Sequence, residues 1–181
     1  MVTLTISHGH DALSSQWIEF DKILARFTDR GDWSRFKKNH GVTGHAVVTE
    51  IKHNRNGWNV HAHLILTLDH QPSPEASDRL QDAVRARWST RADRLGHTAL
   101  PSRQAFSWMS YDFTASTMAE YVTKQNLLHH APDPHAGRYP ADLLAGAQQG
   151  DADDYDLYAE YLDAATGHAL IRQYGHLSAR S

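Results

Sequence analysis

The sequence predicts an α+β fold: a central antiparallel sheet in the order β-α-β-β-α-β-α, followed by a C-terminal helical extension. Stretches of β-branched or alternating residues are separated by stretches in which apolar residues recur at helical spacing. An Asn-Gly pair at residues 56–57 joins two of the strand-like stretches, which is typical of an antiparallel hairpin. Of the 181 residues, 40% are hydrophobic, which is enough to build one core.

The first half of the chain is expected to contain a strand, a helix and the hairpin. Residues 2–7 alternate in polarity, as in a strand. Residues 12–30 are expected to form a helix, whose apolar stripe comprises Leu13, Trp17, Phe20, Ile23, Leu24 and Phe27. Residues 43–53 and 58–68 are expected to form the two strands of the hairpin.

The second half is expected to complete the sheet and then to turn helical. The expected elements are helix 75–95, strand 104–113, helix 115–128, and two further helices at 140–148 and 152–165. A Pro-rich linker precedes the last two helices, so residues 1–130 form the main domain and 131–181 a linker with a helical extension packed on it. This order resembles ferredoxin-like folds, in which helices cover one face of the sheet and the other stays free.

Two histidines in the hairpin are candidate metal ligands. His61 and His63 are separated by one residue in a strand, so their side chains point to the same face. If Asn56 and Gly57 form the turn, Lys52 lies opposite His61 and Glu50 lies opposite His63. A slip of two residues would move Glu50 beside His61 on the same face, whereas a slip of one would turn it away.

His61 and His63 are more informative together with a carboxylate than as an isolated His-x-His pair. The chain has 14 histidines, so an isolated His-x-His could arise by chance as structural residues. Together with a carboxylate, however, two imidazoles on a rigid hairpin suit Mn²⁺ or Mg²⁺ with positions left for substrate oxygens. The sequence therefore predicts a divalent-metal site of His61, His63 and Glu50.

A tyrosine and a lysine in the expected helix 115–128 are candidate catalytic residues. Tyr121 and Lys124 are three residues apart and share a helical face. A neighbouring ammonium favours the phenolate form of a tyrosine and can also neutralise a phosphate. The alternative is a half-buried tyrosine beside a surface lysine, which is the commoner situation for this spacing alone.

These stretches occur in an order that resembles the three motifs of HUH endonucleases. The motifs are Thr3-Leu4-Thr5-Ile6-Ser7-His8, then Glu50 with Trp58-Asn59-Val60-His61-Ala62-His63, then Tyr121-Val122-Thr123-Lys124. The chain is most similar to rolling-circle plasmid replication initiators of actinobacterial type. Residues 137–180 resemble the helical segment that follows the tyrosine helix in that family, so the resemblance covers nearly the whole chain.

The resemblance implies a function and roles for these residues. In this interpretation the chain nicks single-stranded DNA or an origin hairpin with Mn²⁺ or Mg²⁺ held by His61, His63 and Glu50. Tyr121 attacks a phosphodiester and becomes linked to the 5′ end, while Lys124 positions the phosphate. The reaction would initiate rolling-circle replication with a host helicase or polymerase. The expected DNA contacts lie beside the hairpin turn: Lys52, Arg55 and Trp58.

Two departures from the family concern how the reaction ends. Some relatives have a second tyrosine four residues after the first, where this chain has Gln125. Other initiators have a glutamate four residues before the tyrosine, where this chain has Thr117. The sequence therefore predicts a single nucleophile without a hydrolytic base nearby.

Three alternatives stay open. A relaxase or transposase of the same family would share the motifs. A phosphohydrolase with alternating histidines would resemble the stretch at His61, but Ile65 stands where a third histidine is expected. A DNA-binding module without catalysis would not need Tyr121 and Lys124.

Composition fits a small cytoplasmic domain. The chain has no cysteine, which excludes disulfides and thiolate-ligated zinc. No apolar run approaches the roughly 20 residues of a membrane span, and no signal peptide is visible. The net charge of −3 argues against a nonspecific DNA binder, but the acidic residues gather in the last third. The basic residues lie mostly before Tyr121.

Overall fold

The computed structural model describes residues 1–108 and 137–175. Within these residues the strands are β1 (Val2–Thr5), β2 (Val42–Asn54), β3 (Gly57–Leu68) and β4 (Ile171–Gly175). The helices are α1 (Leu13–Phe27), α2 (Arg30–Asn39), α3 (Pro74–Asp93), α5 (Pro140–Gln148) and α6 (Ala152–Ala165), with a 3-10 turn, η1, at Pro101–Arg103.

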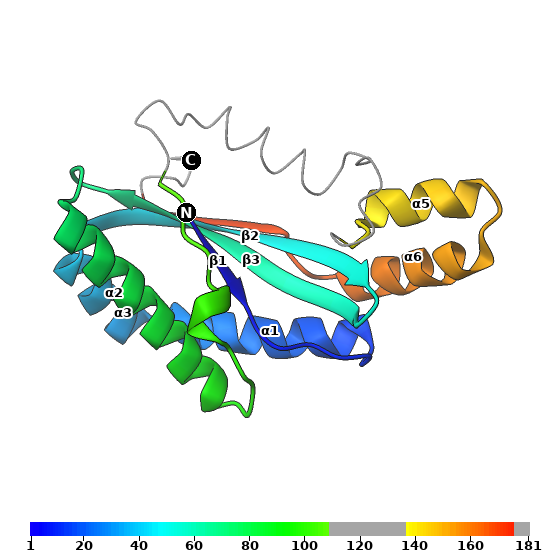
Figure 1. Ribbon diagram of the computed structural model, residues 1–181, viewed down its shortest axis with the longest axis horizontal. Coiled ribbons are helices and arrows are strands. Elements are labelled where there is room, and N and C mark those ends of the chain that lie inside the picture. Colours follow the sequence, from blue (N-terminus) through cyan, green and yellow to red (C-terminus); the bar gives the residue numbers. More distant parts are fainter. Residues whose placement is uncertain (109–136, 176–181) are drawn as a thin grey trace.

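The described strands form one antiparallel sheet. Its order is β1-β3-β2-β4, and every pair of neighbours is antiparallel. Helices α1, α2 and α3 lie along one face of this sheet, while α5 and α6 lie beyond the end at which β2 turns into β3 (Figure 1). The α+β class with a central antiparallel sheet, predicted from the sequence, is confirmed.

The core lies between the sheet and the helices on that face. The apolar stripe predicted for residues 12–30 is buried in full, from Leu13 to Phe27. Trp88 of α3 packs against Phe20 and Phe27, with ring centroids 5.4 and 5.7 Å apart, and its Nε1 donates to the carbonyl of Thr5 2.8 Å away. The aromatic contacts fix α1 and α3 against the strands.

Helix α1 is tied to the C-terminal helices through one carboxylate. Glu160 of α6 accepts hydrogen bonds from the backbone N–H of Leu13 at 2.7 Å and from Trp58 Nε1 at 2.9 Å. Because the first N–H groups of a helix have no partner within it, Glu160 acts as a cap supplied by another helix. The start of α1 and the hairpin are therefore held together by α6.

The ends of several elements differ from the prediction. The helix expected over 12–30 ends at Phe27, and a separate helix, α2, follows it. The C-terminal segment is not only helical, because β4 pairs with β2. The strand expected over 104–113 is seen in part: Phe106 forms an isolated bridge to Val2 at the free edge of β1. Residues 104, 105, 107 and 108 are described but belong to no strand, whereas residues 109–113 and the helix expected over 115–128 lie outside the described residues.

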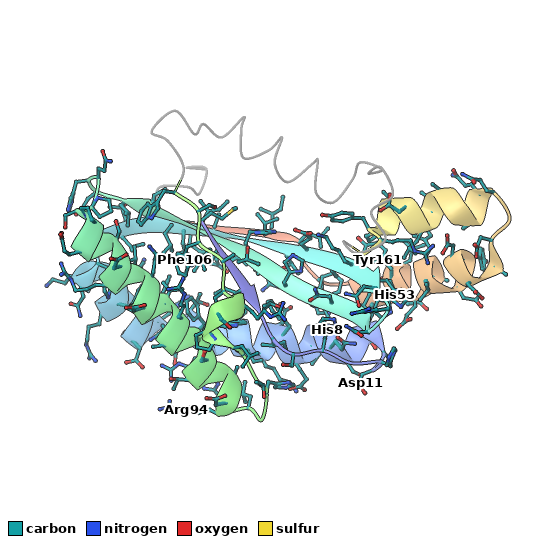
Figure 2. The ribbon with its side chains drawn as sticks, in the orientation of Figure 1. His8, Asp11, His53, Arg94, Phe106 and Tyr161 are labelled. Atoms are coloured by element: carbon teal, nitrogen blue, oxygen red, sulfur yellow. The ribbon has the colours of Figure 1, made fainter. Side chains whose placement is uncertain are left out.

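A polar segment at residues 6–12 leads from β1 into α1 and passes the hairpin turn. His8 and Asp11 lie in it, and His53 marks the nearby end of β2 (Figure 2). Gly57 has a φ of +91°, and a Cβ added there would lie 2.4 Å from the carbonyl oxygen of Gly9. The turn and this segment therefore approach each other through their backbones, which only a glycine permits.

Candidate metal centre

The register of the hairpin brings the three predicted ligands together. Glu50 lies opposite His61, and Asn54 pairs with Gly57, so that Arg55 and Asn56 form the turn. The pairing predicted from the Asn-Gly turn, with Glu50 opposite His63, is wrong by two residues. No residue other than glycine has a positive φ in the described chain, so Asn56 does not take the conformation that the predicted turn requires. A slip of two residues preserves the face, as the sequence also indicated.

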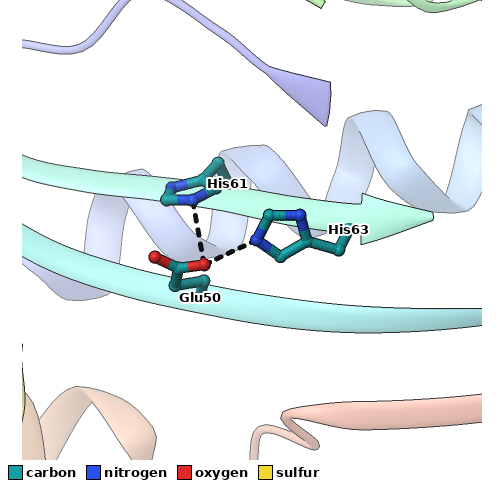
Figure 3. Close-up of side chains that lie close together, drawn as sticks. All are labelled: Glu50, His61 and His63. Atoms are coloured by element: carbon teal, nitrogen blue, oxygen red, sulfur yellow. Dashed lines mark hydrogen bonds and ion pairs between the residues drawn. The ribbon is translucent and has the colours of Figure 1, made fainter. Parts of the chain in front are cut away.

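The two imidazoles converge on one oxygen of the carboxylate (Figure 3). Glu50 Oε2 lies 2.5 Å from His63 Nε2 and 3.3 Å from His61 Nε2. The ring centroids are 5.4 Å apart and the rings are nearly perpendicular, at 79°. Glu50, His61 and His63 are 1%, 8% and 6% exposed as whole residues, so they are buried more deeply than a free sheet face predicts.

The outer nitrogens of the two rings have different surroundings. His63 Nδ1 lies 3.2 Å from the hydroxyl of Thr3, which is its partner across β1 and β3. A hydroxyl can either donate or accept, so Thr3 suits both neutral tautomers of the ring. His61 Nδ1 is buried and has no hydrogen-bond partner among the residues that the structure describes.

A lysine and a tyrosine border the carboxylate on its other side. Lys52 Nζ forms an ion pair with Glu50 Oε1 at 2.8 Å and lies 4.5 Å from the centre of the Tyr139 ring. Burial lowers the pKa of Lys52, but hydrogen bonds to Glu50 and Tyr139 raise it by more. Burial also raises the pKa of the Tyr139 hydroxyl. Lys52 therefore remains charged and Tyr139 neutral near pH 7.

Burial and hydrogen bonding act in opposite directions on the charges of the ligands. Burial raises the pKa of Glu50, but hydrogen bonds to His61 and His63 lower it by more, so the net pKa lies well below the usual range. Burial lowers the pKa of His61 by more than Glu50 raises it. Glu50 is thus ionised and His61 neutral near pH 7, the forms in which these groups bind metals.

The donor set fits a divalent metal ion. One ligand atom from each of Glu50, His61 and His63 lies within 4.8 Å of the others, the sole such group of three in residues 1–108 and 137–175. Two imidazole nitrogens and one carboxylate oxygen form a set that divalent metals accept while keeping positions for water or substrate. The hairpin holds all three on one rigid element, so this buried group could bind a divalent metal.

The other predicted site residues are dispersed. Arg55 is exposed in the hairpin turn. Trp58 lies on the opposite face of β3 from His61, where it is 2% exposed and bonded to Glu160, so the structure does not bring it to the metal ligands. Strand alternation explains this placement, because residues 58 and 61 differ by an odd number. Tyr121 and Lys124 lie outside the described residues.

The face of the metal ligands continues into a small apolar cluster. Ile65 follows His61 and His63 on β3 and packs with Ala46 and Val48 of β2, all three buried. The position at which an alternating-histidine hydrolase would have its third histidine is therefore part of a hydrophobic contact. The ligand set ends at two histidines, which disfavours that alternative.

Sequence reasoning did not identify Tyr139 or Thr3 as neighbours of the site. Tyr139 reaches it because Arg138 and His53 exchange two backbone hydrogen bonds of 2.8 Å, which no local pattern announces. Thr3 could have been found by strand alternation, had the pairing of β1 with β3 been known.

Comparisons with known proteins add no family to this geometry. No protein-family model matches the chain, and neither a curated protein nor a solved structure matches it. Among the described helices, none has both the length and the apolar character that crossing a membrane requires.

Proposed function

We propose that the chain is a metal-dependent, single-stranded DNA endonuclease and strand transferase that nicks a replication origin. Tyr121 forms a 5′-phosphotyrosine intermediate, and the free 3′ end starts rolling-circle replication. The protein acts in the cytoplasm on single-stranded or hairpin DNA, alongside a host helicase or polymerase. The proposal combines the order of the three sequence motifs with the geometry of the metal ligands.

One observation carries the proposal: the convergence of Glu50, His61 and His63 within 4.8 Å on a single rigid hairpin. Burying a carboxylate costs free energy unless the group is paired and hydrogen-bonded, and here two imidazoles and an ammonium surround it. Near pH 7, Glu50 and His61 have the charge states that bind metal. Perturbed groups of this kind gather at functional sites.

The chemistry divides between the metal ligands and the nucleophile. Glu50, His61 and His63 would hold Mn²⁺ or Mg²⁺, which when bound neutralises charge on a phosphate oxygen. Tyr121 attacks phosphorus, so that its Oη–P bond forms and the P–O3′ bond breaks. The phenol proton is lost, and the leaving 3′-oxygen ends as a hydroxyl. Lys124 holds the phosphate for in-line attack.

Metal binding is tested first. Titration of the protein with Mn²⁺, followed by calorimetry and by the loss of the free-ion electron paramagnetic resonance signal, should give saturable binding. His61→Ala should abolish it, and Glu50→Ala should weaken it about 10–100-fold. His70→Ala is the control, because that side chain is 74% exposed and lies after the end of β3. Equal Mn²⁺ affinity in His61→Ala and in the wild type would refute the site.

Cleavage is tested with Mn²⁺ and single-stranded oligonucleotides that cover a candidate origin. A covalent protein–DNA band should form with the wild type and vanish in Tyr121→Phe, while DNA binding persists. Tyr155→Phe is the matched control, since Tyr155 lies on α6 and is 65% exposed. An adduct peptide that maps to another tyrosine would overturn the role of Tyr121, and no adduct under any metal would overturn the proposed reaction.

A further inference from the structure

The two oxygens of the Glu50 carboxylate have different partners: two imidazoles on one side and an ammonium on the other. Oε2 faces the Nε2 atoms of His61 and His63, whereas Oε1 pairs with Lys52 Nζ at 2.8 Å. The Glu50 residue is 1% exposed, so its carboxylate depends on these neighbours rather than on bulk water. It bridges the candidate metal position and an ammonium group, as a carboxylate bridges the two ions of a two-metal centre.

Contacts with Glu50 and with the Tyr139 ring fix the position of the Lys52 side chain. Its ammonium lies 4.5 Å from the centre of the Tyr139 ring, a distance at which the cation is attracted to the ring face. Tyr139 is in turn fixed at the start of α5, where its backbone N–H donates to Asp142 Oδ2 at 2.9 Å. A lysine side chain ordinarily loses considerable entropy on being ordered, and here that loss has already occurred before any ligand binds.

The Lys52 side chain is partly accessible to solvent. The Lys52 side chain remains 20% exposed, whereas that of Glu50 is 1% exposed. An ammonium has three N–H donors, and its partners in the described chain are Glu50 and Tyr139. Within residues 1–108 and 137–175, one N–H donor of Lys52 is therefore left for a ligand that approaches the candidate metal ligands from the Lys52 side.

We propose that Lys52 is the second cationic group of this centre and binds a non-bridging oxygen of the substrate phosphodiester beside the metal. This proposal rests on the proposed function, and it names the substrate group that the site selects. The formal charges are −1 for Glu50, 0 for the two histidines, +2 for the metal and +1 for Lys52, which sum to +2. A centre of that charge attracts a phosphodiester anion and disfavours a second divalent ion beside Oε1.

A purely structural role for Lys52 makes the opposite prediction for metal affinity. If Lys52 only orients Glu50, its removal should weaken metal binding, because the carboxylate would lose its position. If Lys52 acts as a cation beside the metal, its removal relieves repulsion and frees Oε1. Metal binding should then stay the same or become tighter, while DNA binding becomes weaker.

The experiment compares Lys52→Gln with Lys38→Gln. Lys38 is exposed on α2, which covers the opposite face of the sheet, so its variant removes the same charge away from the centre. Calorimetry measures Mn²⁺ affinity and stoichiometry, and fluorescence anisotropy measures the affinity of the Mn²⁺-loaded protein for a single-stranded oligonucleotide over a range of salt concentrations. Circular dichroism confirms that each variant is folded.

For Lys52→Gln we expect Mn²⁺ binding that is unchanged or up to about tenfold tighter, still with one ion per chain. Oligonucleotide affinity should fall about tenfold, and the slope of log K against log salt should shrink by about 0.7, the value for one phosphate contact on a single strand. Lys52→Arg retains the charge and should keep most of the slope. Lys38→Gln should leave Mn²⁺ binding unchanged and shift DNA affinity less than Lys52→Gln.

Three results would overturn the proposal while leaving the proposed function in place. They are weaker Mn²⁺ binding in Lys52→Gln, an unchanged salt slope, and binding of two Mn²⁺ ions by the wild type. If Lys52→Gln does not fold, Lys52→Arg decides, because a salt slope lower than the wild type's would contradict a role based on charge. Failure of the wild type to bind any Mn²⁺ would overturn the metal site itself, and the proposal with it.

Discussion

Replacing Gly57 with alanine should destabilise the protein far more than the same change at Gly96. Both glycines have a positive φ, +91° and +80°, so an alanine at either position is strained. Their surroundings differ. A Cβ at Gly57 would lie 2.4 Å from the carbonyl oxygen of Gly9 and 3.1 Å from His10 Cα, whereas a Cβ at Gly96 meets nothing within 4 Å.

The magnitudes follow from these two contributions. Holding an L-residue in a left-handed conformation costs about 1–2 kcal/mol, which is the whole cost expected at Gly96. At Gly57 the new methyl group must also displace backbone, and inserting a methyl group into a packed region costs about 1–3 kcal/mol more. The free energy of unfolding should therefore fall by about 2–5 kcal/mol in Gly57→Ala.

Urea denaturation followed by circular dichroism measures both variants. The midpoint should fall in each, with a larger fall for Gly57→Ala, while the slope stays that of the wild type because the same surface is exposed on unfolding. Equal destabilisation of the two variants would refute the close approach of the hairpin turn to residues 6–12. Because the turn precedes His61 by four residues, Gly57→Ala should also weaken Mn²⁺ binding.

Three further results are expected. Glu160→Ala should lower the free energy of unfolding by about 2–4 kcal/mol, because the N–H donors of Leu13 and Trp58 lose a charged acceptor, and a urea midpoint equal to that of the wild type would contradict this. Burial and nearby Lys37 lower the pKa of His45 from 6.5 to about 4, so between these pH values the unfolded chain binds more protons than the folded protein does. The free energy of unfolding should therefore fall by up to about 3 kcal/mol as the pH falls from 6.5 to 4. This dependence, measured as urea midpoints against pH, should shrink in His45→Phe. If Tyr121 is the single nucleophile, as proposed, two oligonucleotides of different length should yield joined products of swapped length. Rapid release of a 5′-phosphorylated strand would instead reveal a hydrolytic base.

The shared face of the candidate metal ligands could be predicted from the sequence, although the pairing of these residues across the hairpin could not. Side chains on a strand repeat every two residues, so any even slip of register leaves Glu50 on the face of His61 and His63. The exact pairing depends on the φ angles of the turn, and here the glycine follows a two-residue turn of Arg55 and Asn56. The sheet face on which a side chain lies can therefore be predicted more securely than the exact pairing of residues between the two strands.

The elements that sequence reasoning missed have little local signal. β4 is a short edge strand whose apolar residues Ile171 and Tyr174 are 44% and 48% exposed, so it lacks the buried alternation that marks a strand. Helix α2 buries a single residue of its own, Trp33, and its apolar pattern is correspondingly weak. Both are stabilised by contacts with the rest of the sheet and core, which a local window does not contain.

One of the two contacts of Lys52 could be predicted from the local sequence pattern, and the other could not. The sequence predicted it as a DNA contact, yet the alternation that placed Glu50 beside the histidines also places Lys52 on that face, two residues along the strand. The ion pair between Lys52 and Glu50 could therefore have been predicted from the sequence. Its second partner, Tyr139, was not, because that residue comes from a segment that reaches β2 only through the bridge between Arg138 and His53. The hairpin alone thus positions the candidate metal ligands, whereas the position of the cation beside them depends on the C-terminal part of the chain. Gly137 has a φ of +77°, so Gly137→Ala should loosen that bridge. The variant should accordingly weaken DNA binding more than it weakens metal binding.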